Sequence, residues 1–392
     1  MSEWKKVKLK DCCIKIGSGS TPKGGSMVYV NSGTSLIRSQ NVYNLSFDYN
    51  GLTHITEDAA NKLKGVTVFN EDILLNITGD SVARTCIVPK EVLPARVNQH
   101  VAIIRTDRKK MNWRFLNYYL ASPKMQAHML SLAVGKGASR NAMTKQMIEN
   151  FEVPYPPLST QHRIATILSR YDSLIENYQK QIKLLEEAAQ RLYKEWFVDL
   201  RFPGHENTNI IDGVPEGWEK KSVDSIYNIK YGKNLSTKLI TETGFYPVYG
   251  ANGVIGYYDK ANCNEQVVLI TSRGNGSGDV LMTYHKDAFI TNNSFIVTPS
   301  EGFEYCKLPF TFQFLKMANF RAVRTGAAQP QLTNQSIHTV DVILPNKNLI
   351  EKFCSATIGM NDTIIKYREQ IRLLTEARDR LLPKLMSGAI EV

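Results

Sequence analysis

The chain has 392 residues, about twice the length of one ordinary domain, with 22% charged residues and a formal net charge of +11. No apolar run is long enough to cross a membrane and the first residues lack the apolar core of a secretory leader, so we expect a cytoplasmic protein. The six cysteines have neither C-x-x-C nor zinc-ligand spacing, which favours free thiols and excludes a disulfide scaffold.

Residues 1–157 are expected to form a mixed α/β domain. They carry 21 Lys+Arg against 12 Asp+Glu, a balance that favours a polyanionic partner. Short β-rich runs alternate with polar, glycine-rich loops, and one helix is predicted at 113–120. In such loops Gly lets the backbone approach phosphate, Arg can bind guanine, and Asn or Gln can bind adenine. The candidate DNA contacts are Arg38, Gln40, Asn41, Arg84, Lys136, Ser139, Arg140 and Asn141; for each, an ordinary solvated loop residue is the alternative.

Residues 158–202 are expected to form a long helix. Apolar residues recur at alternating steps of three and four over more than four heptads, which is typical of a coiled coil. Ser159 precedes the pattern as a candidate N-cap, and Phe202-Pro203-Gly204 ends it. The candidate seam residues of this helix are Ile175, Tyr178, Ile182, Leu185 and Leu192.

A linker at 203–214 leads to a second predicted mixed α/β domain at 215–345. Linker and domain together, residues 203–345 carry 12 Lys+Arg against 13 Asp+Glu, so any contact with DNA must come from local clusters rather than from net charge. The polar loops of this domain are also rich in glycine. The candidate DNA contacts are Lys233, Asn252, Arg273, Asn275, Arg324, Gln329 and Gln331, with the same alternative for each.

Residues 346–392 repeat the heptad pattern, with Thr357 and Arg378 as polar intrusions. We expect Asn348 as the N-cap and a kink or end at Pro383. Because a long seam cannot be buried within a small domain, its partner must be the other helix, another subunit or both. We expect the two helices to pair antiparallel; the alternative is that each packs on its own domain. The candidate seam residues here are Ile364, Tyr367, Ile371, Leu374 and Leu381.

The second half of the chain is a copy of the first. GASRNAMTKQMIENFEVPYP (137–156) aligns with GAAQPQLTNQSIHTVDVILP (326–345) at an offset of 189, and the same offset holds through both helices. At the front of each half the offset is 214, and ILLNITGD (73–80) matches VLITSRGN (268–275). Two similar scaffolds with divergent fronts indicate two dissimilar binding domains on one plan.

Signatures of catalysis are missing from the sequence. There is no GxxxxGK[ST] loop, no Asn-Pro-Pro-aromatic tetrad and no HExxH. Asp212, Glu219 and Lys221 could suggest a nuclease triad, but they lie at a linker, and His100 and His162 are assigned packing or capping roles. We therefore expect a non-catalytic chain without a metal or cofactor of its own.

The chain resembles the specificity subunit of type I restriction-modification systems. The resemblance rests on W-x-x-V/K-x-L near each start, DILLNITGDS (72–81), VNQHV (97–101), YPVYGANGVIGYY (246–258), PLSTQHRIATIL (157–168) and RLLPKLMSGAIEV (380–392). The second half departs from the family at TSRGNGSG, which replaces an N-x-x-G-D-type turn.

The resemblance implies a tandem duplication of two mixed α/β target-recognition domains, separated and followed by long helices that pair as an antiparallel coiled coil. Each domain would bind one half of a bipartite, asymmetric site in double-stranded DNA, and the helices would set the spacer. Two methyltransferase subunits, which modify adenine N6, and two restriction subunits would assemble on it. S-adenosylmethionine, ATP and Mg²⁺ would belong to these partners. The alternatives are an enzyme with its own catalytic site and a helical adaptor that does not bind DNA.

Overall fold

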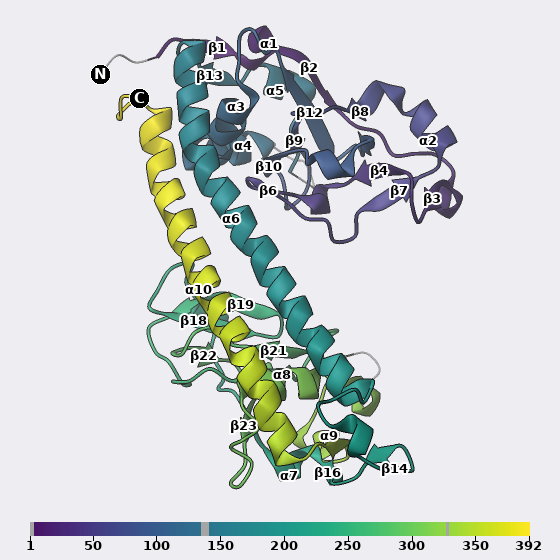
Figure 1. The fold of residues 1–392 in the computed structure, drawn as a ribbon. Helices are drawn as coiled ribbons and strands as arrows, with labels where there is room; N and C mark the ends of the chain where they lie inside the picture. Colours follow the sequence, from purple (N-terminus) through teal and green to yellow (C-terminus); the bar gives the residue numbers. More distant parts are fainter. Residues whose placement is uncertain (1–3, 135–140, 327–328) are drawn as a thin grey trace. The chain divides into compact units, whose positions relative to one another are not determined.

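The computed structural model describes residues 4–134, 141–326 and 329–392. The chain divides into two compact units, the first formed by residues 1–176 with 372–392 and the second by residues 177–371. Each unit therefore contains one globular domain, here called domain 1 or domain 2, and one part of each long helix (Figure 1). Among the described residues, no helix has the length and apolar character to cross a membrane.

The core of domain 1 is an antiparallel four-stranded sheet whose inner strands are apolar on both faces. Along β9, Ile73 and Leu75 face one hydrophobic cluster and Leu74 faces another, as the two-residue period of a strand requires. The first cluster includes helices α3 (Trp113–Ala121) and α4 (Pro123–Ala133), and the second includes residues of a neighbouring sheet. The strand order is β10 (Thr85–Ile87), β9 (Ile73–Asn76), β12 (Val101–Thr106) and β2 (Cys13–Ser18).

The neighbouring sheet of domain 1 has five strands, and only its β4–β11 pair is parallel. Its order is β3 (Tyr29–Val30), β7 (Thr53–Ile55), β4 (Thr34–Ile37), β11 (Ala95–Val97) and β8 (Thr67–Val68). The smaller elements are β1 (Lys6–Lys8), which pairs with β13 (Glu152–Pro154), β5 (Val42–Tyr43), which pairs with β6 (Ser46–Phe47), and helices α1 (Leu9–Cys12), α2 (Glu57–Lys62) and α5 (Lys145–Glu149).

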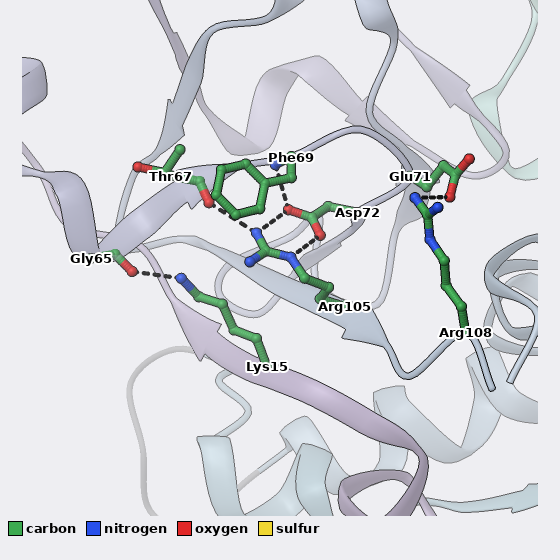
Figure 2. A network of polar contacts seen from close by, with 8 residues as sticks. All are labelled: Lys15, Gly65, Thr67, Phe69, Glu71, Asp72, Arg105 and Arg108. Carbon is green, nitrogen blue, oxygen red and sulfur yellow. Dashed lines mark hydrogen bonds and ion pairs between the residues drawn. The ribbon is translucent and has the colours of Figure 1, made fainter. Parts of the chain in front are cut away.

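An ion pair in the central sheet also contacts the neighbouring sheet. Arg105 of β12 donates from Nε and Nη2 to the two carboxylate oxygens of Asp72, each at 2.7 Å, and from Nη2 to the carbonyl of Thr67 at 3.1 Å. Its guanidinium lies 4.0 Å from the centroid of the Phe69 ring, and Lys15 donates to the Gly65 carbonyl beside it (Figure 2). The Asp72 side chain is fully buried, so this pair fixes the segment before β9 against the central sheet.

Domain 2 repeats this plan with fewer strands. Its central sheet runs β17 (Tyr227–Tyr231), β23 (Ser294–Pro299), β20 (Val268–Thr271) and β21 (Val280–Met282). The second sheet runs β19 (Gly253–Tyr258), β18 (Tyr246–Gly250) and β22 (Phe289–Ile290), with β18–β22 parallel as β4–β11 is in domain 1. The remaining elements are β14 (Ile210–Ile211) with β15 (Val214–Pro215), β16 (Glu219–Ser222) with β24 (Asp341–Leu344), α7 (Val223–Ile226), α8 (Leu308–Met317) and α9 (Asn334–Ile337).

The long helices α6 (Leu158–Tyr193) and α10 (Lys347–Met386) pair antiparallel in both units. In the second unit the Tyr178 and Tyr367 rings lie 4.8 Å apart and the Tyr193 and Phe353 rings 5.8 Å apart, so the contact moves down α10 as it moves up α6. In the first unit Ile164, Ala165 and Leu168 share a buried cluster with Leu382, Leu385 and Met386. The predicted antiparallel pairing is thus confirmed, and packing of each helix on its own domain alone is wrong.

The expected helix ends need correction. Asn346, not Asn348, caps α10, because its Oδ1 accepts the Leu349 N–H at 3.0 Å, and Ser159 lies inside the first turn of α6. Helix α10 includes Pro383 and ends at Met386, while α6 closes with a π turn at Lys194–Val198. A second helix, α4, follows α3, where the sequence predicted only the helix at 113–120.

Candidate nucleic-acid interface

Loops from four places in the sequence meet at the end of strand β9 in domain 1. In the turn after β9, the Ile77 N–H donates to the His100 carbonyl (3.0 Å), and the Ile77 carbonyl accepts the Met143 N–H (2.8 Å). Within the same turn, the Gly79 N–H donates to the Asn141 carbonyl (3.0 Å). The turn is therefore tied to the loops on both sides of it through the main chain, independently of the side chains.

The corresponding loops of domain 2 make the same bonds after β20. The Ser272 N–H donates to the Asn293 carbonyl (2.8 Å), and the Ser272 carbonyl accepts the Leu332 N–H (2.7 Å). The Gly274 N–H donates to the Pro330 carbonyl (3.0 Å). These residues are the repeat equivalents of those in domain 1, so one backbone arrangement is built twice.

Left-handed residues occur at matching places in the two turns. Gly79 and Gly274 have φ of +74° and +83°, and Ala83 and Gly278 have φ of +74° and +88°. Turns that adopt the left-handed region at the same two points follow the same path. The TSRGNGSG segment of domain 2 therefore keeps the turn geometry although its sequence departs from the N-x-x-G-D pattern.

A glycine completes each arrangement by close backbone approach. A Cβ at Gly19 would overlap the carbonyl oxygen of Val97, and a Cβ at Gly232 would overlap that of Thr291, so neither position accepts a side chain. We call the resulting set of loops the loop platform. It consists of residues 19–20, 76–84, 97–101 and 141–143 in domain 1, and of residues 232–233, 271–279, 290–294 and 330–332 in domain 2.

The side chains on the two loop platforms differ in charge. Where domain 1 has Ser20 and Thr78, domain 2 has Lys233 and Arg273, and where domain 1 has Asp80, domain 2 has a neutral asparagine. The reverse holds at one position, where domain 1 has Arg84 and domain 2 has Asp279. The two loop platforms therefore carry their charges at different places, and Lys233 and Arg273 are the cations that only domain 2 has.

Of the candidates in domain 1, two share one acceptor and one is internal. Arg38 Nη2 and Gln40 Nε2 both donate to the Gly51 carbonyl, at 2.7 and 3.3 Å. Asn41 is fully buried; its Nδ2 donates to the Asp48 carbonyl, and its Oδ1 accepts the Arg38 N–H. An internal amide of this kind cannot reach a base, so Asn41 shapes the loop instead.

Two further candidates of domain 1 lie at the platform turn. The guanidinium of Arg84 lies 4.7 Å from the centroid of the Tyr43 ring, and half-buried Asn141 contributes its carbonyl to the loop platform. Lys136, Ser139 and Arg140 lie outside the described residues.

Most candidates in domain 2 gather around its loop platform. Arg273 is exposed and forms a β-bridge with Gln331, which is also exposed. Arg324 donates from Nε to the Arg321 carbonyl at 3.1 Å, and its Nη1 lies 3.5 Å from the Asn275 carbonyl. Exposed Asn252, Lys233 and Gln329 belong to the adjoining loops.

Sequence reasoning missed a polar chain at the loop platform of domain 1. Thr78 Oγ1 lies 2.6 Å from His100 Nδ1, and His100 Nε2 lies 3.2 Å from Gln99 Nε2. The side-chain oxygen of Gln99, Oε1, accepts a hydrogen bond from the Thr21 hydroxyl. His100 had been assigned to packing or capping, and only its place in VNQHV beside a polar loop could have suggested otherwise. His162 does support a cap, because its Nδ1 lies 2.9 Å from Nδ2 of Asn112, the N-cap of α3.

The expected seam residues lie along both helices at different depths. Ile175, Ile182 and Ile364 are buried, and the others are half-buried or pair at the seam. The half-buried ones are Tyr178, Leu185, Leu192, Tyr367, Ile371, Leu374 and Leu381.

The polar intrusion Arg378 has a partner within the first unit. Its Nη1 donates to Asp172 at 2.8 Å, and the Tyr118 hydroxyl donates to the same carboxylate. Burial and the Asp172 charge raise the pKa of Tyr118. Burial is the largest single influence on Arg378 and opposes its ionisation, but the hydrogen bonds and negative charges of Asp172 and Asp379 together outweigh burial and raise the pKa of Arg378.

Across the parts of the chain that the structure describes, no three His, Cys, Asp or Glu side chains are grouped so as to hold a metal ion. The chemistry of the loop platforms is that of hydrogen-bond donors and acceptors on a fixed backbone. Such an arrangement suits recognition of a ligand with many polar edges.

The fold and the two loop platforms define a protein with two related recognition domains carried on paired helices. The family model described as "Type I restriction modification DNA specificity domain" matches residues 1–187 and 215–368, and the chain belongs to this family. It is a type I restriction-modification specificity subunit with target-recognition domains in tandem.

Two relatives match it over all or nearly all of their length. The MjaIX specificity subunit of Methanocaldococcus jannaschii is 26% identical over 100% of this chain and 94% of its own. The HindI specificity subunit of Haemophilus influenzae is 21% identical over 100% of both. A crystal structure of the S subunit from M. genitalium superposes with a TM-score of 0.58 at 17% identity, covering 97% of this chain and 96% of that one, which supports the fold.

Proposed function

We propose that each domain binds one half of a bipartite, asymmetric site in double-stranded DNA, with its loop platform facing the bases. The observation that carries the proposal is the same backbone arrangement in both domains with different side chains on it. An identical backbone would approach DNA in the same way twice, while different side chains would select different bases. Linking two weak half-site contacts in one chain raises affinity through effective concentration.

The loop candidates would supply both base and phosphate contacts. Arg, Asn and Gln can form paired hydrogen bonds with base edges, while Lys and Ser fix the position on the phosphates. The proposed set is Arg38, Gln40, Arg84, Lys136, Ser139, Arg140, Asn141, Lys233, Asn252, Arg273, Asn275, Arg324, Gln329 and Gln331. Asn41 is left out because it is internal. Phosphate contacts of this number would make affinity fall steeply with salt.

The paired helices would set the spacer between the half-sites and dock two methyltransferase subunits. These would use S-adenosylmethionine to methylate adenine N6, and two restriction subunits, dependent on ATP and Mg²⁺, would join through them. The chain itself would remain non-catalytic, since its sequence lacks the methyltransferase tetrad and the P-loop. It would act in the cytoplasm, where the DNA is.

The deciding experiment is reconstitution with the methyltransferase subunits, followed by sequencing that detects N6-methyladenine. We expect one bipartite motif, no methylation by the chain alone with S-adenosylmethionine, and a change in one half-site when residues 1–157 are exchanged for those of a relative. A change in both halves, or robust activity of the chain alone, contradicts the proposal.

The spacer role has its own test. Seven residues inserted after Lys180 and seven after the equivalent Glu369 add about 10 Å to both helices and should lengthen the spacer by about three base pairs. A matched insertion in the linker at 203–214 is the control and should leave the spacer unchanged. An unaltered spacer in the helix variant refutes the role.

A further inference from the structure

Resting on the proposed function, we propose that three pairs of equivalent positions on the loop platforms determine which bases each domain selects. The pairs are Thr78 with Arg273, Gln99 with Asn292, and His100 with Asn293. The His100 and Asn293 carbonyls accept the same main-chain hydrogen bond in their domains, and Gln99 and Asn292 directly precede them. Thr78 and Arg273 form the matching β-bridges, to Ala142 and Gln331. Because the backbone is common here, a difference in base preference at these places comes from their side chains.

In domain 2 these positions present open donors on a fixed main chain. The Asn292 N–H donates to the Lys233 carbonyl at 3.0 Å, and the Asn293 carbonyl accepts the Ser272 N–H. Within the described ranges, the side chains of Arg273, Asn292 and Asn293 have no hydrogen-bond partner. Their donors are therefore free for a ligand while their backbones are held.

The chemistry of these side chains indicates what they would bind. A guanidinium forms a bidentate pair with O6 and N7 of guanine, and an amide forms one with N6 and N7 of adenine. We therefore assign Arg273 to a guanine contact and the two asparagines to adenine contacts. The half-site of domain 2 should contain both bases.

In domain 1 the same positions are joined to one another. Gln99 Oε1 accepts from the Thr21 hydroxyl, and Gln99 Nε2 lies 3.2 Å from His100 Nε2. In the His100 tautomer that accepts from Gln99, the ring proton is on Nδ1, 2.6 Å from Thr78 Oγ1, and the Thr78 hydroxyl proton is left for the ligand. We assign this tautomer as part of the proposal.

The two domains therefore offer different chemistry from one place. Domain 2 offers a cationic fork and two amides, whereas domain 1 offers a neutral chain that ends in a hydroxyl donor. A hydroxyl contacts either purine or pyrimidine edges and discriminates less than a bidentate fork. At this place we expect domain 1 to show the weaker preference.

The test uses the full chain in complex with its methyltransferase subunits and measures the methylated motif. Arg273→Ala should relax one base pair of one half-site, lowering discrimination against the mismatched base roughly tenfold to a hundredfold. Asn293→Ala should relax a second position in the same half. His100→Ala, which breaks the chain leading to Thr78, should alter only the other half. Lys62→Ala, which removes an exposed charge of α2 outside the loop platforms and the paired helices, is the control and should leave the motif intact.

The outcomes separate this inference from the proposed function. If the wild-type complex produces no bipartite motif, the proposed function fails. If the wild type produces one and Arg273→Ala or Asn293→Ala leaves both halves unchanged, the assignment of positions fails alone. The assignment also fails if Arg273→Ala lowers methylation equally at all sequences, because that is the behaviour of a phosphate contact. It fails as well if His100→Ala alters the same half-site as Arg273→Ala.

Discussion

The ion pair within the helix seam of the first unit gives the sharpest test of the packing. Arg378 of α10 donates to Asp172 of α6 at 2.8 Å, and their side chains are only 13% and 22% exposed. The Tyr118 hydroxyl of α3 donates to the same carboxylate. The cluster therefore ties domain 1 to both helices, and Arg378→Ala would leave Asp172 with one hydrogen bond in a largely dry place.

The expected loss can be bounded. Breaking a fully buried pair by removing one partner costs about 3–5 kcal/mol, because the remaining charge is uncompensated. Some solvent reaches this pair, so we expect the free energy of unfolding to fall by about 2–3 kcal/mol for Arg378→Ala. Asp172→Asn should cost a similar amount, since it leaves Arg378 without its main acceptor.

The second unit shows how the helices pair when this ion pair is absent. The repeat equivalents of Asp172 and Arg378 are Asn361 and Ala189, so the same helix pairing tolerates a neutral combination there. Asp172→Asn with Arg378→Ala should therefore cost less than the sum of the two single changes. Urea unfolding would measure the three losses, and hydrogen exchange over residues 113–133 would locate them. Single losses below about 1 kcal/mol, or strictly additive ones, would refute the reasoning.

Three further changes have defined outcomes. Asp72→Asn leaves Arg105 buried without its bidentate partner and should lower the free energy of unfolding by about 3 kcal/mol in a thermal or urea melt; an unchanged melt would show that solvent screens the pair. A cavity of about 40 Å³ in the second unit is lined by Ala189, Asn361 and Met282 among others. Ala189→Leu should fill it and raise the free energy of unfolding by up to about 1 kcal/mol in a urea melt. The control Ala356→Leu, at an exposed position of α10, should leave that free energy unchanged. Burial raises the pKa of the Cys86 thiol to about 12, so above pH 9 the folded state keeps a proton that the unfolded state loses. The free energy of unfolding should therefore fall by about 1.4 kcal/mol per pH unit above pH 9. Urea titrations at several pH values would measure this slope, and Cys86→Ala should flatten it.

Much of the fold followed from local patterns. The β-rich runs at 73–77, 100–105 and 266–271 predict strands, and they contain β9, β12 and β20, because continuous apolar residues suit strands covered on both faces. The heptad steps predicted the helices α6 and α10, and a mutual seam was needed to bury them. The β-rich run at 289–297 gave no sign of a break, whereas the structure has two strands there, β22 and β23, separated by a loop of the loop platform.

The candidate site was only partly accessible to sequence reasoning. Residue types and glycine-rich loops pointed to Arg273 and Gln331, which lie beside each other. The same reasoning wrongly included Asn41, whose amide hydrogen-bonds within its own loop. It also missed His100, which contacts Thr78. Both outcomes depend on neighbours in space that the local sequence does not reveal. Burial of a loop residue is a property of distant neighbours and leaves no local mark.

The sequence by itself determined that this chain is a duplicated protein with two long helices, two divergent loop-rich domains and no recognisable catalytic motif. These features are periodicities and repeats, which arise from the chain's own local spacing. Tertiary structure alone decided that Arg378 meets Asp172 and that Thr78, Gln99 and His100 form one chain. Contacts of that kind depend on which distant segments the hydrophobic clusters bring together, and this choice is made by packing across the whole domain rather than by any stretch of residues.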